Sequence, residues 1–273
     1  MPARFTDKVV CITGASAGIG AAAARRFAAE GAKVVLSARG AERLEAVVAE
    51  IRAAGGEAHG VVGDVGVDAD AERLLDEAVA AFGGLDVLVN NAGLHHRGPV
   101  RDRSAAELAD MVHVNLRAPV LLTRLALPLL EARGGGRGVQ VASLARRVPT
   151  PGGAPYSASK FGLRAFSFAL NDELAGTGIT VSVVSPGPVD TGFIMGDVDE
   201  VSDLTFSQPI STAAQVADAI LACAHDGKRE RTLPAKSRVL TTSAYLMPWL
   251  GRALRPALEA KGRRVKARLR REG

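Results

Sequence analysis

The chain has 273 residues, of which 47% are hydrophobic and 23% charged. This apolar content is too high for a disordered chain, and the length suits a single α/β domain. No apolar run is long enough to span a bilayer, and two cysteines cannot form the disulfide framework of a small secreted module.

The net charge of +5 is concentrated at the C-terminal end. Residues 228–273 contain 14 Lys and Arg against three acidic residues, a net charge of +11, whereas residues 1–227 carry −6. A mildly acidic body with 4% aromatic content argues against a nucleic-acid groove. The first residues show no apolar signal segment, so we expect a reducing, cytoplasmic location.

Short apolar runs alternate with longer helical patterns. The expected strands, rich in Val, Leu or Ile, are Lys8–Thr13, Lys33–Ser37, Glu57–Val62, Leu85–Asn90, Gly138–Ala142, Thr180–Pro186 and, last, Arg231–Pro234. The expected helices, with apolar residues three and four apart, are Gly18–Glu30, Ala41–Ala54, Asp68–Phe82, Ser104–Arg133 and Tyr156–Gly176. This alternation predicts a three-layer α/β/α sandwich around a doubly wound, mainly parallel sheet of about seven strands. Ligands of such sheets bind beyond the carboxyl ends of the strands.

The first expected strand runs into a glycine-rich turn, Thr13–Gly20, which opens an Ala-rich helix. Gly14, Gly18 and Gly20 allow a tight turn, close approach to a pyrophosphate and close packing of helix on strand. The N-terminus of the helix faces the phosphates. A strand before the turn and a helix after it favour nucleotide binding over a loop that merely needs small residues.

A second group of polar residues follows the later strands. Tyr156 and Lys160 are four residues apart in a helical pattern, so they share one face. An ammonium beside a phenol favours the phenolate, and we expect Tyr156 to act as general acid or base near neutral pH. Ser143 follows the strand Gly138–Ala142 and can hydrogen-bond a substrate oxygen. Its surroundings are not the G-x-S-x-G elbow of a hydrolase.

As an ordered set, these motifs resemble the short-chain dehydrogenase/reductase family. They occur as Thr13–Gly20, Asn90–Gly93, Asn115, Ser143 with Tyr156–Lys160, and Pro186–Thr191. The resemblance covers about residues 7–225. It implies a Rossmann-like fold and an oxidoreductase that interconverts a ketone or aldehyde and an alcohol by hydride transfer, as a carbonyl reductase does.

The resemblance also implies roles for individual residues. In the family, a tyrosine moves the proton, a lysine holds the nicotinamide ribose and tunes the tyrosine, a serine polarises the carbonyl, and an asparagine holds a water in a proton relay. The matching residues here, expected to be catalytic, are Asn115, Ser143, Tyr156 and Lys160. Each alone could be structural, but the four together favour catalysis.

The end of the second strand indicates which nicotinamide cofactor is preferred. Ala38 stands where NAD-dependent relatives have an acidic residue for the ribose 2′-hydroxyl. Without that acid, Arg39 can bind a 2′-phosphate, so we expect NADP(H) rather than NAD(H). The alternative is that Arg39 is a solvated loop residue.

Further cofactor contacts follow from the resemblance. Asp64 and Val65 match a pair that contacts adenine, and Thr191 matches a contact to the nicotinamide carboxamide. The remaining residues expected to bind the cofactor are Gly14, Ser16, Gly18, Ile19, Gly20, Arg39, Asn91, Ala92, Gly93, Tyr156, Lys160, Pro186, Gly187 and Val189. No metal site is expected: His95 and His96 are interpreted as solvated loop residues, with a place in the pocket as the alternative.

The variable substrate loop of the family corresponds to about residues 190–211, where Phe193 and Leu204 are mixed with acidic residues. A lid over a ketone pocket and a mobile surface loop both fit this composition. Arg146 and Arg147 could attract an acidic substrate, but a surface role is preferred.

Residues 1–235 are interpreted as the Rossmann-type catalytic domain and residues 236–273 as a basic extension. The extension has an apolar stripe formed by Leu246, Trp249, Leu250, Ala253 and Leu254. It packs on its own subunit or a partner, or rests peripherally on an anionic membrane. Pro248 and Pro256 should interrupt a long helix, which favours packing.

The family's members are commonly homodimers or homotetramers, which the resemblance implies here through the helices Ser104–Arg133 and Tyr156–Gly176. Two other functions stay open. One is an NAD-preferring alcohol or steroid-type dehydrogenase, and the other is a non-catalytic, cofactor-binding regulatory protein of the same fold.

Overall fold

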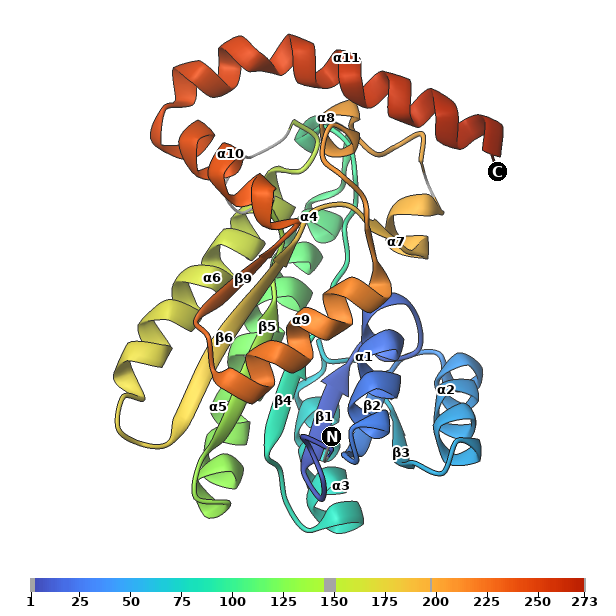
Figure 1. Ribbon diagram of the computed structural model, residues 1–273, viewed down its shortest axis with the longest axis vertical. Helices are drawn as coiled ribbons and strands as arrows, with labels where there is room; N and C mark the ends of the chain where they lie inside the picture. The colour runs from blue at the N-terminus through green and yellow to red at the C-terminus, as the bar shows by residue number, and fades with distance from the viewer. Residues whose placement is uncertain (1–2, 145–150, 197, 273) are drawn as a thin grey trace.

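The computed structural model describes residues 3–144, 151–196 and 198–272. Its centre is a seven-stranded sheet in the order β3-β2-β1-β4-β5-β6-β9 (Figure 1). All neighbouring strands are parallel. The strands are β1 (Val9–Thr13), β2 (Lys33–Ala38), β3 (Glu57–Val62), β4 (Val87–Asn90), β5 (Gly136–Val141), β6 (Ile179–Pro186) and β9 (Glu230–Leu233). The strand order reverses between β1 and β4, and ligands of open α/β sheets bind at that point.

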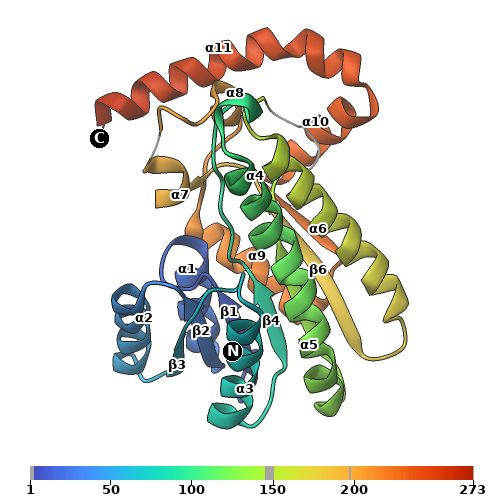
Figure 2. The ribbon, with the colours of Figure 1, turned by 180° about the vertical axis from the view of Figure 1, so that it is seen from behind.

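Helices cover both faces of the sheet (Figures 1 and 2). One face carries α1 (Gly18–Ala29), α2 (Ala41–Ala53) and α9 (Ala213–Asp226). The other carries α3 (Asp68–Phe82), α5 (Ala118–Ala132) and α6 (Ala154–Glu173). Strands buried on both faces account for the continuous apolar runs of the sequence. The predicted three-layer α/β/α fold is confirmed.

The helix expected over residues 104–133 is divided into three segments. It consists of α4 (Ala105–Val112), the π-helical η2 (His113–Arg117) and α5. A capping box starts α4, because the Ser104 hydroxyl accepts from the Glu107 amide and the Glu107 carboxylate accepts from the Ser104 amide. The π turn in the middle widens the helix around Asn115, and such turns concentrate at functional sites.

The substrate loop and the C-terminal extension lie together beyond the carboxyl ends of the strands. The loop contains the paired β7 (Val189–Asp190) and β8 (Ser211–Thr212), with α7 (Gly192–Met195) and α8 (Asp203–Phe206) between them. The chain ends in α10 (Ala235–Leu246) and α11 (Pro248–Glu272). Figures 1 and 2 show α11 lying across α8 at this end of the molecule.

Two expectations about the extension are only partly met. The helix does break before Pro248, which begins α11, but Pro256 lies inside α11 without ending it. Packing of α11 on α8 and α10 offsets the hydrogen bond that Pro256 removes. The predicted apolar stripe does not pack on the protein as one face, since Leu246 is 70% and Trp249 62% exposed whereas Leu254 lines a cavity of the protein. The break at Met247 separates these two residues onto different helices.

Among the described residues, no helix combines the length and apolar character that crossing a membrane requires.

Candidate functional site

A cavity of about 980 Å³ lies at the carboxyl ends of β1, β4, β5 and β6. Most of the residues expected to form the site line it: Gly14, Ser16, Gly18, Ile19, Asn91, Ala92, Gly93, Ser143, Tyr156, Lys160, Pro186, Gly187, Val189 and Thr191. The expected residues that do not line it are Gly20, Arg39, Asp64, Val65 and Asn115. Segments far apart in the sequence therefore meet at one place.

The glycine-rich turn and the loop after β4 are tied together. The Thr13 hydroxyl accepts hydrogen bonds from the backbone amides of Asn91 and Ala92, both at 3.0 Å. The Asn91 amide group donates to the carbonyl oxygens of Thr13 at 2.9 Å and Gly14 at 3.2 Å. Thr13 therefore connects the glycine-rich turn to the loop after β4, but it is absent from the expected site residues. A hydroxyl residue at the end of a strand was the signal in the sequence that could have indicated this role.

The turn has the shape that a dinucleotide needs. Gly14 adopts φ +65°, and a Cβ there would lie 2.9 Å from the Ala92 Cα. A Cβ at Gly20 would lie 2.2 Å from the Gly14 carbonyl oxygen, so this position admits no side chain. Gly20 therefore packs against the backbone of Gly14 and does not line the cavity. The open backbone amides at the start of α1 fit a pyrophosphate.

Tyr156 lies in the first turn of α6, beside Ser143 at the end of β5. Burial raises the pKa of the Tyr156 phenol and outweighs the lowering by its hydrogen bond with Ser143 and by the charge of Arg97. The expectation that Lys160 brings this pKa down is not met. The Lys160 ammonium instead donates to the Val141 carbonyl oxygen at 2.9 Å.

Lys160 is only 5% exposed, and burial lowers its pKa to about 8. A glycine at position 93 makes room for it, because a Cβ there would lie 3.4 Å from Lys160 Nζ and 3.0 Å from Asn115 Oδ1. Gly93 therefore lets the loop after β4 approach two site residues at once.

Asn115 is fully buried within the π turn. Its Oδ1 accepts from the Leu94 amide and its Nδ2 donates to the Leu94 carbonyl oxygen, both at 2.8 Å. Nδ2 also lies 3.4 Å from the Ser159 hydroxyl. Asn115 thus connects η2, the loop after β4 and α6, although it does not line the cavity itself.

The interpretation of His95 as a solvated residue is wrong. Its imidazole lies stacked on the Tyr156 ring, with centroids 4.2 Å apart, and it lines the cavity. Burial and the charge of Arg97 lower the pKa of His95 to about 4, so the ring is neutral near pH 7. No described residue hydrogen-bonds its buried Nε2. Sequence reasoning missed this contact because the loop after β4 has no regular periodicity.

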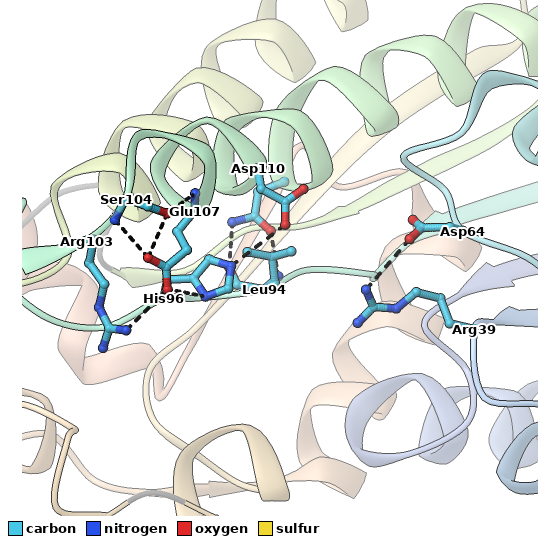
Figure 3. Close-up of polar contacts among 9 residues, drawn as sticks. Arg39, Asp64, Leu94, His96, Arg103, Ser104, Glu107 and Asp110 are labelled. Atoms are coloured by element: carbon cyan, nitrogen blue, oxygen red, sulfur yellow. Dashed lines mark hydrogen bonds and ion pairs between the residues drawn. The ribbon is translucent and has the colours of Figure 1, made fainter.

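Arg39 and Asp64, expected at the adenosine end of the cofactor, pair with each other and do not line the cavity (Figure 3). Arg39 is 72% exposed at its side chain and lies 3.7 Å from the Asp64 carboxylate. Arg43, in the first turn of α2, lines the cavity instead and lies beside Gly40. Arg43 was missed, although its position four residues after Arg39 places it near the same turn.

His96 does not line the cavity, and Figure 3 shows it beside Glu107 and Asp110 of α4. Its ring nitrogens lie 3.8 Å from carboxylate oxygens of Glu107 and of Asp110. Within the described ranges, no group of three or more His, Cys, Asp or Glu side chains could hold a metal ion.

The substrate loop contributes apolar groups to the outer cavity. Phe193, Ile194 and Leu204 line it, whereas Phe206, the last residue of α8, is fully buried. The Arg97 guanidinium lies over the Phe193 ring at 5.3 Å and donates to the Phe193 carbonyl oxygen. Arg146 and Arg147 lie outside the described residues.

A family model described as short chain dehydrogenase matches residues 8–201. A ketoacyl reductase, HetN, from Nostoc sp. is 39% identical over 222 residues, covering 80% of this chain and 75% of that protein. A 2,5-dichloro-2,5-cyclohexadiene-1,4-diol dehydrogenase, LinX, from Sphingobium indicum is 41% identical over 191 residues, covering 70% of this chain and 76% of that protein.

Solved structures share the fold. A short chain dehydrogenase from Burkholderia cenocepacia, crystallised with NADP, superposes with a TM-score of 0.77 at 34% identity, covering 85% of this chain and 98% of its own. A metagenomic short-chain oxidoreductase, also with NADP, gives a TM-score of 0.73 at 35% identity, covering 84% and 98%.

Proposed function

This chain belongs to the short-chain dehydrogenase family, and on that basis we propose that it is an NADP(H)-dependent oxidoreductase that interconverts a ketone or aldehyde and an alcohol. The observation that carries the proposal is the meeting of Ser143, Tyr156 and Lys160 on a cavity that continues into the glycine-rich turn. A nucleotide cradle and a proton-transfer group then share one space, as hydride transfer to a carbonyl requires.

The residues at the turn fit a dinucleotide. Gly14 and Gly18 adopt positive φ and leave the backbone open, and Thr191 approaches Gly18, where a Cβ would meet its Cγ2 at 3.3 Å. In this proposal the glycine-rich turn holds the pyrophosphate, and Thr191 and Val189 hold the nicotinamide end. When bound, the nicotinamide would supply or accept the hydride.

In the proposed reduction, Tyr156 donates its phenolic proton to the carbonyl oxygen of the substrate. The raised pKa of Tyr156 keeps this proton on the phenol until the substrate oxygen develops negative charge. The Ser143 hydroxyl hydrogen-bonds the same oxygen and stabilises that charge. Lys160, fixed by the Val141 carbonyl, holds a donor beside the reacting groups. Asn115, held by Leu94, would bind a water of the proton relay to solvent.

NADP(H) is preferred in this proposal over NAD(H). Ala38 leaves the end of β2 without a carboxylate, Arg39 follows it directly, and Arg43 lines the cavity, so either arginine could bind a ribose 2′-phosphate. The two relatives solved with NADP support the same preference. Arg39 pairs with Asp64 and would exchange this partner for the phosphate.

The test is fluorescence titration with NADPH and NADH, followed by absorbance-monitored turnover on a panel of ketones and aldehydes. We expect tighter NADPH binding and turnover that Tyr156→Phe abolishes while NADPH still binds. Tight binding without turnover on any compound of the panel would favour a regulatory protein of this fold. Tighter NADH binding would favour the NAD-preferring alternative.

We also propose a homodimer or homotetramer formed through α4, α5 and α6. Phe161 on α6 lies with its ring centroid 6.0 Å from that of Tyr245 and is still 42% exposed, and an oligomer interface would cover the exposed part. Size-exclusion chromatography with light scattering measures the number of subunits, and Phe161→Glu should lower that number. A cytoplasmic location, the division at residue 235 and peripheral membrane contact through Leu246 and Trp249 stay predictions, the last tested by vesicle co-sedimentation.

A further inference from the structure

The cavity extends beyond the groups that the proposed chemistry uses. Its outer part is lined by Ile194 and Leu204 of the substrate loop and by Gly251, Leu254 and Leu258 of α11. The α11 residues are three and four positions apart, so they form one helix face. The extension therefore supplies an apolar wall to the same cavity that Tyr156 lines.

The face continues along α11 and fixes the helix to the substrate loop. Gly262 packs so closely that a Cβ there would lie 1.7 Å from the Asp203 carbonyl oxygen. Lys266 is 8% exposed and donates to the carbonyl oxygens of Asp199 at 2.8 Å and Val201 at 2.9 Å. Arg270 Nε donates to the Asp199 carboxylate at 2.8 Å. The wall is thus held in place by buried polar contacts as well as by apolar packing.

Positive charge lies at the edge of this apolar wall. Arg252 and Arg255 line the cavity from α11. Arg255 Nε is 2.7 Å from Glu259 Oε1, whereas Arg252 has no carboxylate within 4.0 Å among the described side chains. The acidic residue that lines the cavity, Glu200, is 3.9 Å from the guanidinium of Arg103. At the α11 side of the cavity, Arg252 therefore has capacity for an external anion.

We propose that this site takes an elongated aliphatic carbonyl compound that ends in an anionic group, a carboxylate or a phosphate. The chain packs between Leu254 and Leu258 of α11 and the substrate loop, and the anion meets Arg252. Each buried methylene should then tighten binding about fourfold. The identity of the reacting carbonyl rests on the proposed function, but binding of the ligand's aliphatic chain and of its anionic group does not.

Calorimetry on the full chain tests the site without turnover. Octanoate and hexyl phosphate should bind at least about tenfold more tightly than methyl octanoate, because only they offer a charged acceptor. Arg252→Gln should bring octanoate to the affinity of the ester and leave the ester unchanged. The matched control is Arg264→Gln, an exposed arginine of α11 that does not line the cavity. Tighter binding of one of the two anions would distinguish carboxylate from phosphate.

Equal affinities for octanoate and its ester, or the same loss in Arg264→Gln, would overturn the inference. A turnover arm separates this result from a failure of the proposed function. Reduction of neutral octanal that depends on Tyr156, with no preference for 8-oxooctanoate, would leave the function standing and remove the anion site. Octanoate binding that depends on Arg252, without reduction of any aldehyde, would do the reverse.

Discussion

The imidazole of His95 lies flat on the phenol of Tyr156, with the ring planes 11° from parallel and the centroids 4.2 Å apart. The contact covers one face of the proposed proton donor with a neutral ring, because burial holds the pKa of His95 at about 4. An imidazolium in this place would be unfavourable, since Arg97 already carries a positive charge nearby. His95 therefore connects the electrostatics of the site to the stability of the protein.

Replacing His95 with Phe should weaken the pH dependence of stability. The unfolded chain protonates this histidine near its ordinary pKa of 6.5, whereas the folded state does so near 4. Between these values the unfolded state binds more protons, so the free energy of unfolding falls as the pH drops. Between pH 7 and pH 5, this residue should lower the free energy of unfolding of the wild-type protein by about 1.5 kcal/mol, after its partial exposure is discounted.

Urea denaturation at pH 7 and pH 5 measures the effect as the difference between wild type and His95→Phe. His96→Phe is the matched control, because this neighbouring ring lies outside the cavity against Glu107 and Asp110. An equal loss of stability in wild type and His95→Phe would contradict the buried, neutral state of His95.

Replacing Lys160 with Met should stabilise the fold and remove activity. Burial lowers the pKa of Lys160 to about 8 from an ordinary 10.5, so the folded state carries a penalty of about 3 kcal/mol below pH 8. The Val141 carbonyl loses its hydrogen-bond donor in the variant, which lowers the gain in stability by about 1 to 2 kcal/mol. We expect a net gain of about 1 to 2 kcal/mol at pH 7, with turnover reduced at least about 100-fold.

The pH profile provides the check on this account. The unfolded chain holds the Lys160 proton up to about pH 10.5, whereas the folded state loses it near pH 8. The contribution of this residue to the wild-type free energy of unfolding should therefore rise as the pH increases from 8 to 10.5. Lys160→Met should lack that gain. A variant that is less stable than wild type at pH 7 would show that the ammonium stabilises the fold, and the argument from burial would fail.

The strands and the motif positions were predictable because each depends on local pattern. The apolar runs of a parallel sheet and the glycines at 14 and 18 are visible in the sequence itself. The π turn around Asn115 was not, since a single inserted residue leaves the apolar spacing on both sides almost unchanged. The helix predicted over residues 104–133 is therefore present, but its π turn at His113–Arg117 was not predicted.

Contacts between loops and the C-terminal helix were also beyond local pattern. The stripe through Trp249 looked amphipathic, but α11 packs with the face that contains Gly251, Leu258 and Gly262. Which face is buried depends on the shape of the substrate loop, which the sequence of α11 does not contain. Likewise, the place of His95 follows from the path of an irregular loop after β4.

A methyl group at Gly14 should abolish dinucleotide binding. Gly14→Ala adds both strain at φ +65° and a contact of 2.9 Å with the Ala92 Cα. Gly55→Ala is the matched control, because its φ is +84° and nothing lies within 4 Å of a Cβ there. Both should lose about 1 kcal/mol of stability from the left-handed backbone.

Only Gly14→Ala should lose NADPH affinity, at least about 100-fold, by fluorescence titration. Equal affinities in the two variants would mean that the turn does not hold the cofactor.

Arg43 should contribute more to NADP(H) preference than Arg39. Arg43 lines the cavity, whereas Arg39 is 72% exposed and lies 3.7 Å from Asp64, so binding a phosphate there must compete with an existing ion pair. A charge-assisted contact to a phosphate is worth about 1.5 to 3 kcal/mol. Arg43→Gln should therefore lower the ratio of NADPH to NADH affinity about 10-fold or more, and Arg39→Gln by a smaller factor.

The ratio of the two affinities is the informative measurement, because damage to the fold lowers both and leaves their ratio unchanged. Asp64→Asn separates the two arginines further. It releases Arg39 from its ion pair and should raise NADPH affinity in the Arg43→Gln background, where Arg39 is the remaining partner for the phosphate. If Arg39→Gln lowers the ratio more than Arg43→Gln, the originally predicted residue is the selector, and the position of Arg43 in the cavity serves another purpose.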